Sequence, residues 1–270
     1  MSKPAIPDAI RDAMKGVKHK VVVLSGKGGV GKTTVATNLA VSFAKSKHAT
    51  GILDADIYGP NVPKLLGLEG RHPTTDGEKL DPISGPLGMK VMSMGFLLRN
   101  SDDAVAWRGP IVAKAITQFL GDVRWGALDL LVVDLPPGTG DEILSILQSI
   151  PEADGVIIVS TPQEVAVLDA RRAIQLVQRM GVPVLGIIEN MAEFVCPSCG
   201  QSHLLYGEGA AVKAAEDFAI EYLGSLPLDP SIIQLSDKGT PFVVENPDSQ
   251  SSKAFNAVVE KLAKMMGLDE

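Results

Sequence analysis

The sequence of 270 residues contains only two cysteines, Cys196 and Cys199, and has no long apolar run. Two cysteines exclude a disulfide-rich secreted scaffold. From one chain they also supply only half of the ligands of a closed four-coordinate metal site. No stretch approaches the roughly 18 apolar residues of a membrane-spanning helix, and residues 1–20 lack the apolar segment of a secretory signal. We therefore expect a cytoplasmic protein that does not bind a membrane.

Positive charge is also in deficit, because 25 Lys and Arg residues face 32 Asp and Glu residues, for a formal net charge of −7. Nonspecific binding to nucleic acid depends on clustered positive charge, so the sequence predicts no nucleic-acid partner. No linker-like stretch divides the chain. We predict a helix or arm over residues 1–17, in which Ile6, Ile10, Met14 and Val17 have helical spacing, and a single domain over residues 18–268.

Short apolar runs alternate with helical segments along this domain. The apolar runs, often β-branched, predict strands at 20–26, 51–56, 128–138, 155–161 and 182–190. Helical patterns fall at 32–47, 107–123, 164–180, 207–220 and 249–266. Residues 57–100 are rich in Gly and Pro and predict a long excursion with a small hairpin. This alternation favours an α/β fold, with a doubly wound, mostly parallel sheet covered by helices on both faces.

The segment GKGGVGKT, residues 26–33, fits the phosphate-loop pattern G-x-x-x-x-G-K-[ST] between a predicted strand and a predicted helix. Glycines let successive backbone N–H groups turn toward phosphates, and the helix N-terminus favours an anion. We expect Lys32 to reach the β- and γ-phosphates of ATP and Thr33 to bind Mg²⁺. The predicted nucleotide-binding residues of this segment are Gly26, Lys27, Gly28, Gly29, Val30, Gly31, Lys32, Thr33 and Thr34.

Lys27 is a second lysine in the same loop. Two lysines this close repel each other unless anionic phosphate lies between them. The loop KGGVGKT resembles the deviant Walker A motif of the MinD/ParA-type ATPases, a group that includes the nitrogenase iron protein and ArsA-type ATPases. The resemblance implies a P-loop NTPase fold and a homodimer in which Lys27 reaches the nucleotide of the facing subunit.

Three acidic residues end predicted strands at the edge where open α/β sheets bind ligands. Asp134 ends LLVVD, a placement that suits the Mg²⁺ shell. The following PPGTGD resembles the second switch of the group, which implies that Gly138 approaches the γ-phosphate. Asp54 and Asp56 lie in LDADIYGPN, which resembles the first switch. This resemblance implies that Asp56 orients the attacking water and touches the Mg²⁺ shell; with Lys27 and Lys32, Asp56 completes the predicted catalytic set.

The residues predicted to bind the base lie outside the phosphate-loop and switch motifs. Asn190 ends GIIEN, and the related ATPases use an asparagine at such a place to read adenine. Pro227, in GSLPLDP, is predicted to flank the base. An asparagine that only caps a loop fits the same position of the sequence.

Cys196 and Cys199 form a C-x-x-C pair in FVCPSCG, for which four interpretations compete. They are a redox dithiol, half of a zinc site, half of an iron–sulfur site, and an inert pair. The pair lacks the strand-then-helix context of thioredoxin-like motifs. A twofold axis would double two thiolates to four, and Lys27 independently indicates a dimer. Zinc and a 4Fe–4S cluster both accept four thiolates, so the chemistry leaves both open.

Five motifs occur in the order found in the Mrp/ApbC/Nbp-type iron–sulfur cluster carrier ATPases, and the similarity spans about residues 18–265. They are GKGGVGKTT, LDADIYGPN, WRGP at Trp107–Pro110, VVDLPPGTGD, and ENMAEFVCPSCG with the later GEG. The resemblance implies that Cys196 and Cys199 hold a 4Fe–4S cluster that bridges the dimer. It also implies slow ATP hydrolysis, a cluster donor and apo iron–sulfur proteins as acceptors. The sequence resembles the minimal form of the family, without an N-terminal extension.

Two alternatives remain at this point. A MinD- or ParA-like spatial-organising ATPase would need a basic membrane or DNA surface, which the acidic Glu260, Asp269 and Glu270 near the end of the chain disfavour. An ATPase with a zinc-bridged dimer would use the same cysteines for structure alone.

Overall fold

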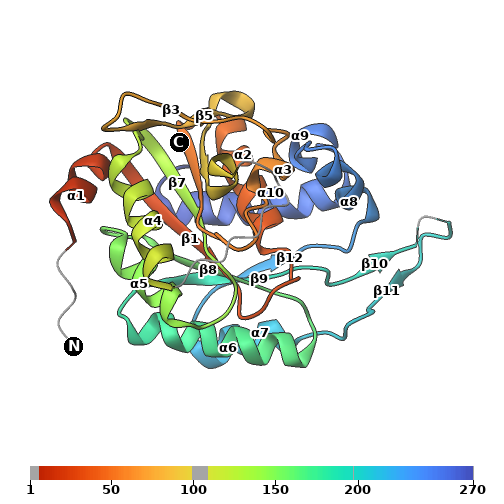
Figure 1. The fold of residues 1–270 in the computed structure, drawn as a ribbon. Coiled ribbons are helices and arrows are strands. Elements are labelled where there is room, and N and C mark those ends of the chain that lie inside the picture. The colour runs from red at the N-terminus through yellow and green to blue at the C-terminus, as the bar shows by residue number, and fades with distance from the viewer. Residues whose placement is uncertain (1–5, 99–108, 197, 270) are drawn as a thin grey trace.

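A computed structural model describes residues 6–98, 109–196 and 198–269 (Figure 1). An eight-stranded sheet forms its centre, in the order β12-β9-β8-β1-β7-β2-β6-β5. All neighbouring strands of this sheet run parallel except β5, which is antiparallel to β6. The strands are β1 (Val17–Leu24), β2 (Thr50–Asp54), β5 (Ile83–Ser84), β6 (Lys90–Ser93), β7 (Leu128–Asp134), β8 (Gly155–Ser160), β9 (Val184–Glu189) and β12 (Tyr222–Ser225).

Helices cover both faces of the sheet, as Figure 1 shows, so the predicted doubly wound α/β fold is confirmed. One face carries α1 (Asp8–Met14), α4 (Gly109–Asp122), α5 (Asp141–Ser149), α6 (Glu164–Arg179) and α7 (Ala210–Phe218). The other carries α2 (Lys32–Lys45), α3 (Val62–Leu65), α8 (Pro230–Asp237), α9 (Phe242–Glu245) and α10 (Gln250–Met266). No helix in the described part of the chain combines the length and apolar character needed to cross a membrane.

The central strand β1 shows why the strands have continuous apolar sequences. Val22 and Leu24 enter the core layer under α4 to α7, while Val21 and Val23 enter the layer under α2 and α10. Successive side chains of a strand point to opposite faces, and here both faces are buried. The sheet is therefore held between two separate apolar layers.

The excursion after β2 differs from its prediction. It does contain a small hairpin, β3 (Thr74–Thr75) with β4 (Leu80–Asp81). However, Lys90–Ser93 forms β6 of the main sheet, parallel to β2, and β12 also joins the sheet without having been predicted. Four-residue strands are too short to show a period of their own, and their pairing depends on distant residues.

The N-terminal helix is present but shorter than predicted. Ile10 and Met14 are buried in the core, and Ile10 packs so closely on α4 that a Cβ added at Gly121 would lie 3.3 Å from its Cγ1. Val17, predicted as part of this helix, instead begins β1. Trp107 and Arg108 of the WRGP motif lie outside the described residues.

Candidate functional site

The phosphate loop connects β1 to α2 at the carboxyl ends of the parallel strands. In the sheet, β7 and then β2 lie on one side of β1 and β8 lies on the other, so the loop sits where the strand order reverses. Ligands bind at such points in open α/β sheets. Gly29 and Gly31 have φ of 80° and 85°, a conformation that favours glycine. Gly26 packs on α6, since an added Cβ would lie 2.2 Å from the carbonyl carbon of Asp169.

A cavity of about 270 Å³ opens over this loop. It includes residues that were not predicted, among them Asn61 and Leu65. Gly26, Lys27, Val30 and Gly138, which were predicted to bind nucleotide, do not line it. The predicted residues on its wall are Gly28, Gly29, Gly31, Lys32, Thr33, Thr34 and Asp56.

Lys32 lies at the centre of the predicted catalytic and metal-binding residues. Its Nζ is 2.7 Å from Asp134 Oδ1 and 3.7 Å from Asp56 Oδ2, and it donates to Thr33 Oγ1 at 3.1 Å. Lys32 and Asp134 are both buried. The structure therefore brings together all three predicted Mg²⁺ ligands, although Thr33 lies in the first turn of α2, Asp56 follows β2 and Asp134 ends β7.

Burial raises the pKa of Asp134 and of Asp56, and in both cases the nearby Lys32 ammonium opposes the shift. Asp134 Oδ2 is buried and has no hydrogen-bond partner among the described residues. Hard oxygen atoms from a hydroxyl and two carboxyls are the donor set that Mg²⁺ prefers. The residues present thus fit a hydrated Mg²⁺ beside the phosphate loop.

Asp54 is completely buried behind Asp56. Burial, and next the neighbouring Asp134, raise the pKa of Asp54 to about 8. Asp54 and Asp134 are register partners at the ends of β2 and β7, which explains their mutual influence.

Lys27 Nζ donates to Gln163 Oε1 at 3.3 Å. Gln163 directly precedes α6 and was not predicted as a site residue. A glutamine in a loop carries no motif, so only the packing of α6 beside the phosphate loop identifies it. Lys27 is half-buried in a single chain.

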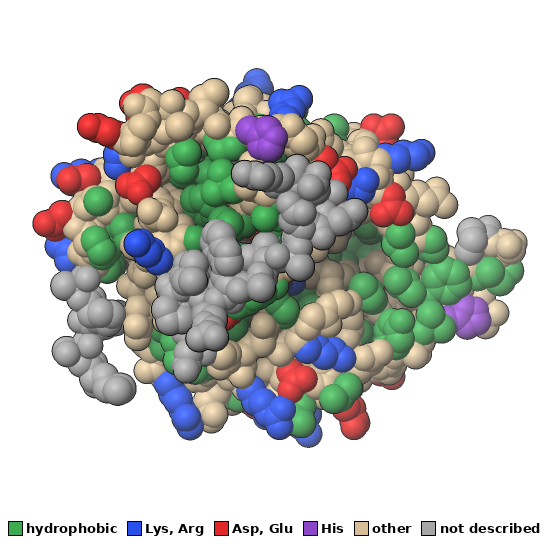
Figure 2. All heavy atoms as spheres, viewed as in Figure 1, with side chains coloured by type: hydrophobic (Ala, Val, Ile, Leu, Met, Phe, Trp, Pro, Cys, Tyr) green, Lys and Arg blue, Asp and Glu red, His purple; other side chains and the backbone are tan. Residues whose placement is uncertain are grey.

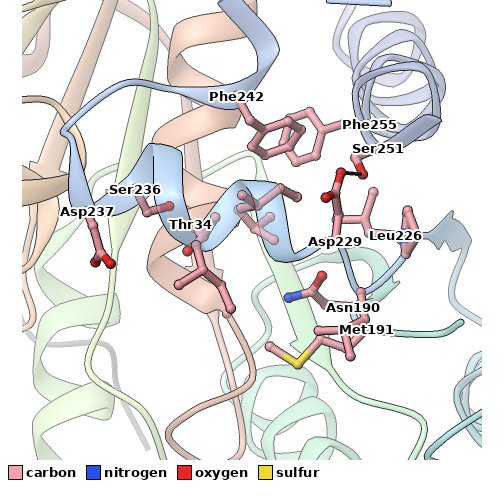
Figure 3. A pocket seen from close by; sticks show the side chains of 16 residues that line it. Thr34, Asn190, Met191, Leu226, Asp229, Ser236, Asp237, Phe242, Ser251 and Phe255 are labelled. Atoms are coloured by element: carbon pink, nitrogen blue, oxygen red, sulfur yellow. Dashed lines mark hydrogen bonds between the residues drawn. The ribbon is translucent and has the colours of Figure 1, made fainter. Parts of the chain in front are cut away.

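A second cavity, of about 200 Å³, adjoins the phosphate cavity and shares Gly31 and Thr34 with it (Figure 3). Asn190 and Pro227, predicted to contact the base, both line it. Asn190 Nδ2 donates to the carbonyl of Val30 at 2.9 Å, which joins the end of β9 to the phosphate loop. A Cβ at residue 31 would lie only 2.1 Å from Asn190 Nδ2, so this contact requires a glycine there.

The other walls of this cavity were not predicted as part of a site, and most of them come from α8, α9 and α10. They form a largely apolar surface on which a planar base could pack, and in Figure 3 two phenylalanine rings lie together above it. Asp229 caps α8 and accepts a hydrogen bond from Ser251 at 2.7 Å. The Asp-Pro pair at 229–230 is a helix-start signal that could have located α8 from the sequence. The apolar wall residues are Val35, Leu226, Ile232, Ile233, Phe242 and Phe255.

The cysteines lie at the tip of an antiparallel hairpin, β10 (Phe194–Val195) with β11 (Ser202–His203), which projects from the body of the molecule (Figure 1). Cys196 N–H donates to Gln201 O at 2.9 Å, and Gly200 N–H donates to Cys196 O at 2.8 Å. Both thiols are free, with Cys199 exposed and Cys196 half-buried. Hydrogen bonds from the backbone of Ser198 and Cys199 lower the pKa of Cys196, which favours the thiolate form that binds metals.

Within the described ranges, no group of three or more His, Cys, Asp or Glu side chains could hold a metal ion. His203 is exposed on β11. Leu204, Leu205 and Tyr206, which follow β11, are also exposed, and Figure 2 shows hydrophobic side chains over much of the projecting hairpin. An exposed apolar surface of this kind is typical of protein contacts.

Comparison with known proteins shows the family of this chain. A family model described as NUBPL iron-transfer P-loop NTPase matches residues 16–263. The iron-sulfur cluster carrier protein of Saccharolobus solfataricus is 46% identical over 262 residues, which cover 97% of this chain and 88% of that protein.

Two solved structures share the fold. The nucleotide-binding protein of Archaeoglobus fulgidus in complex with ADP has a TM-score of 0.79 and 41% identity, over 92% of this chain and 96% of that one. The septum site-determining protein MinD of Pyrococcus horikoshii, complexed with Mg-ADP, has a TM-score of 0.68 at 21% identity, over 94% and 99% of the two chains. The latter similarity extends to the fold alone.

Proposed function

Since this chain belongs to the family of NUBPL iron-transfer P-loop NTPases, we propose that it is an ATP-hydrolysing carrier that binds a 4Fe–4S cluster between two copies of itself and delivers the cluster to apo-proteins. One observation carries the proposal: a hairpin that carries two free cysteines follows β9, and Asn190 at the end of the same strand lines the base pocket of a phosphate-loop site. The cluster is the cargo of this reaction, while ATP is its substrate.

In the proposed nucleotide site, Lys32 binds the β- and γ-phosphates and the apolar cavity beside Asn190 and Pro227 holds the base. Thr33, Asp56 and Asp134 are the residues that would hold Mg²⁺, which neutralises phosphate charge when bound. Asp56 orients the attacking water. Because phosphoryl transfer depends mainly on position and charge, slow hydrolysis needs no stronger base than this carboxyl.

In the proposed cluster site, Cys196 and Cys199 provide two ligands and the same cysteines of a second copy provide the other two. A twofold axis brings the same surface of both copies together, so one short motif yields a complete shell. The exposed apolar residues beside the hairpin support such a contact.

Anaerobic reconstitution with iron and sulfide tests the cargo. The wild type should bind about four irons and four sulfides per dimer, and Cys196→Ser should bind none. Gln201→Ala is the matched control, because its position contacts Cys196 only through the backbone carbonyl. Equal iron in the cysteine variant, or zinc in place of iron after anaerobic purification, would overturn the cluster assignment.

A mixing experiment tests whether Lys27 acts on the partner's nucleotide. Lys27→Ala and Lys32→Ala should each lack ATPase activity when alone. In a mixed dimer the Lys27→Ala subunit keeps Lys32 and receives Lys27 from its partner. Random pairing should therefore restore roughly a quarter of wild-type activity. A mixture as inactive as its components would reject the role of Lys27 across the interface.

A further inference from the structure

Of the three acids that the sequence analysis places at strand ends, Asp54 is the one whose role the nucleotide site does not explain. It ends β2, and its register partners are Asp134 at the end of β7 and Ser93 at the end of β6. All three residues are completely buried. The three strand ends therefore form a row, in which only Asp134 pairs with Lys32.

Both oxygens of the Asp54 carboxyl are taken up by donors from the protein itself. Oδ2 accepts from the hydroxyl of Ser93 at 2.8 Å and from the N–H of Val62 at 3.2 Å. Oδ1 accepts from the N–H of Asp56 at 3.2 Å. Asp54 thus bridges the two ends of the loop between β2 and α3, because it accepts hydrogen bonds from Asp56 at one end and Val62 at the other.

Asp56 is fixed within this closed loop. Its Oδ1 accepts the N–H of Gly59 at 3.3 Å, and its Oδ2 lies 3.7 Å from Lys32 Nζ. The preceding residue, Ala55, donates its N–H to the carbonyl of Asp134 at 2.8 Å. The side chain of Asp56 therefore depends on Asp54 for its place in the phosphate cavity, which Asp54 does not line.

We propose that Asp54 and Ser93 form a positioning pair that holds Asp56 in register with the phosphate loop, and that Asp54 contacts neither the nucleotide nor the attacking water. The inference rests on the proposed ATPase function, because it assigns the pair a purpose in that reaction. Displacing a group by about 1 Å at a reacting centre can cost up to about 100-fold in rate. Ser93 lies on a four-residue strand that no motif marks.

Ser93→Ala removes the donor while preserving the backbone contacts of Asp54. We expect kcat for ATP hydrolysis to fall about tenfold, within the range for a buried acceptor that loses one hydrogen bond. The KM for ATP and the Mg²⁺ concentration at half-maximal rate should change less than twofold. Ser252→Ala is the matched control, because it removes another completely buried hydroxyl with a single hydrogen bond, to the carbonyl of Phe242. It should leave kcat unchanged.

The hydroxyl of Ser93 also accepts the N–H of Gly95 at 3.0 Å, so a second variant separates the two contacts. Asp54→Asn keeps the Gly95 contact but turns an N–H toward one of the three donors around residue 54. We expect it to reproduce the loss in kcat at unchanged Mg²⁺ dependence. A shift of more than tenfold in the Mg²⁺ requirement would instead place Asp54 among the metal ligands and overturn the proposal.

A double-variant cycle tests whether the pair acts through Asp56. In an Asp56→Asn background, Ser93→Ala should lower kcat less than twofold. A full tenfold effect in that background would show that Ser93 acts independently of Asp56.

Hydrogen exchange provides a readout that does not depend on turnover. In nucleotide-free protein, Ser93→Ala should speed exchange of the Asp56 and Val62 amides about tenfold, whereas Ser252→Ala should not. Unchanged exchange rates of the Asp56 and Val62 amides in Ser93→Ala would reject the proposed positioning pair. If the wild type has no ATPase activity but Ser93→Ala still exchanges faster, the proposed function is rejected. The contact between Ser93 and Asp54 would then still stabilise the loop.

Discussion

Replacing Lys32 with methionine should destabilise the protein even in the absence of nucleotide. The substitution preserves much of the side-chain volume but leaves the buried Asp134 carboxyl without its 2.7 Å cationic partner. Asp134 Oδ2 already has no hydrogen-bond partner among the described residues, and besides Lys32 the donor that lowers the pKa of Asp134 is the neutral Thr33 hydroxyl, which cannot replace the lost charge. Removing one partner of a buried ion pair typically costs about 3–5 kcal/mol.

The pH of the measurement limits this cost. Asp134 can always take up a proton, and from an ordinary pKa of 3.8 this costs at most about 4 kcal/mol at pH 7, at 1.36 kcal/mol per pH unit. At pH 5 the same limit is below about 2 kcal/mol. Because the variant's folded state binds a proton that its unfolded state releases, its stability falls as the pH rises through this range. We therefore expect a loss of about 3–4 kcal/mol at pH 7 and of less than about 2 kcal/mol at pH 5.

Urea unfolding of nucleotide-free protein at both pH values measures these free energies. Lys27→Met is the matched control: the same substitution in the same loop, at a half-buried lysine with one 3.3 Å contact, should cost less than about 0.5 kcal/mol. In the Lys32→Met background, Asp134→Asn should restore stability, since it removes the unpaired charge. An unchanged free energy of unfolding for Lys32→Met, or a further loss on adding Asp134→Asn, would refute the reasoning.

Two other substitutions have defined outcomes. Gly31→Ala should cost at least about 1 kcal/mol more than Gly29→Ala in urea unfolding, because both residues have positive φ but only residue 31 would displace Asn190 from Val30; equal losses would contradict this. Glu189→Gln should make the pH dependence of stability shallower above pH 4.5. Burial raises the pKa of Glu189 above 4.5, so this carboxyl lowers stability as the pH rises, and the glutamine variant lacks that contribution; parallel pH profiles of unfolding free energy would show that Glu189 does not contribute.

The parts of the site that local motifs encode could be predicted. A glycine-rich loop between an apolar strand and a helix specifies its own backbone, so Lys32 and Thr33 could be placed without knowing the rest of the fold. The cysteine pair could likewise be found, because a turn of four residues brings both thiols together. The partners Ser93 and Gln163 could not be found in this way, since each reaches the site only through packing of a distant element.

The base pocket shows the same division. Asn190 and Pro227 follow apolar runs that end at the ligand-binding edge, where a polar or turn residue is conspicuous. Phe242 and Phe255 lie in helices whose apolar residues read as ordinary core, and both do pack in the core as well as facing the cavity. Periodicity reports that a side chain is buried but does not report what it is buried against.

The sequence by itself determined the chemistry available to this protein: a phosphate loop, acids at strand ends, and two thiols in one turn. The tertiary structure alone decided which partner each acid takes. Asp54 and Asp134 both end apolar strands and look equivalent in the sequence. The strand order places β7 directly beside β1, so Asp134 meets Lys32, whereas β2 lies beside β6, where Asp54 meets Ser93. Strand order follows from burial summed over the whole sheet, and no short segment of the chain contains that information.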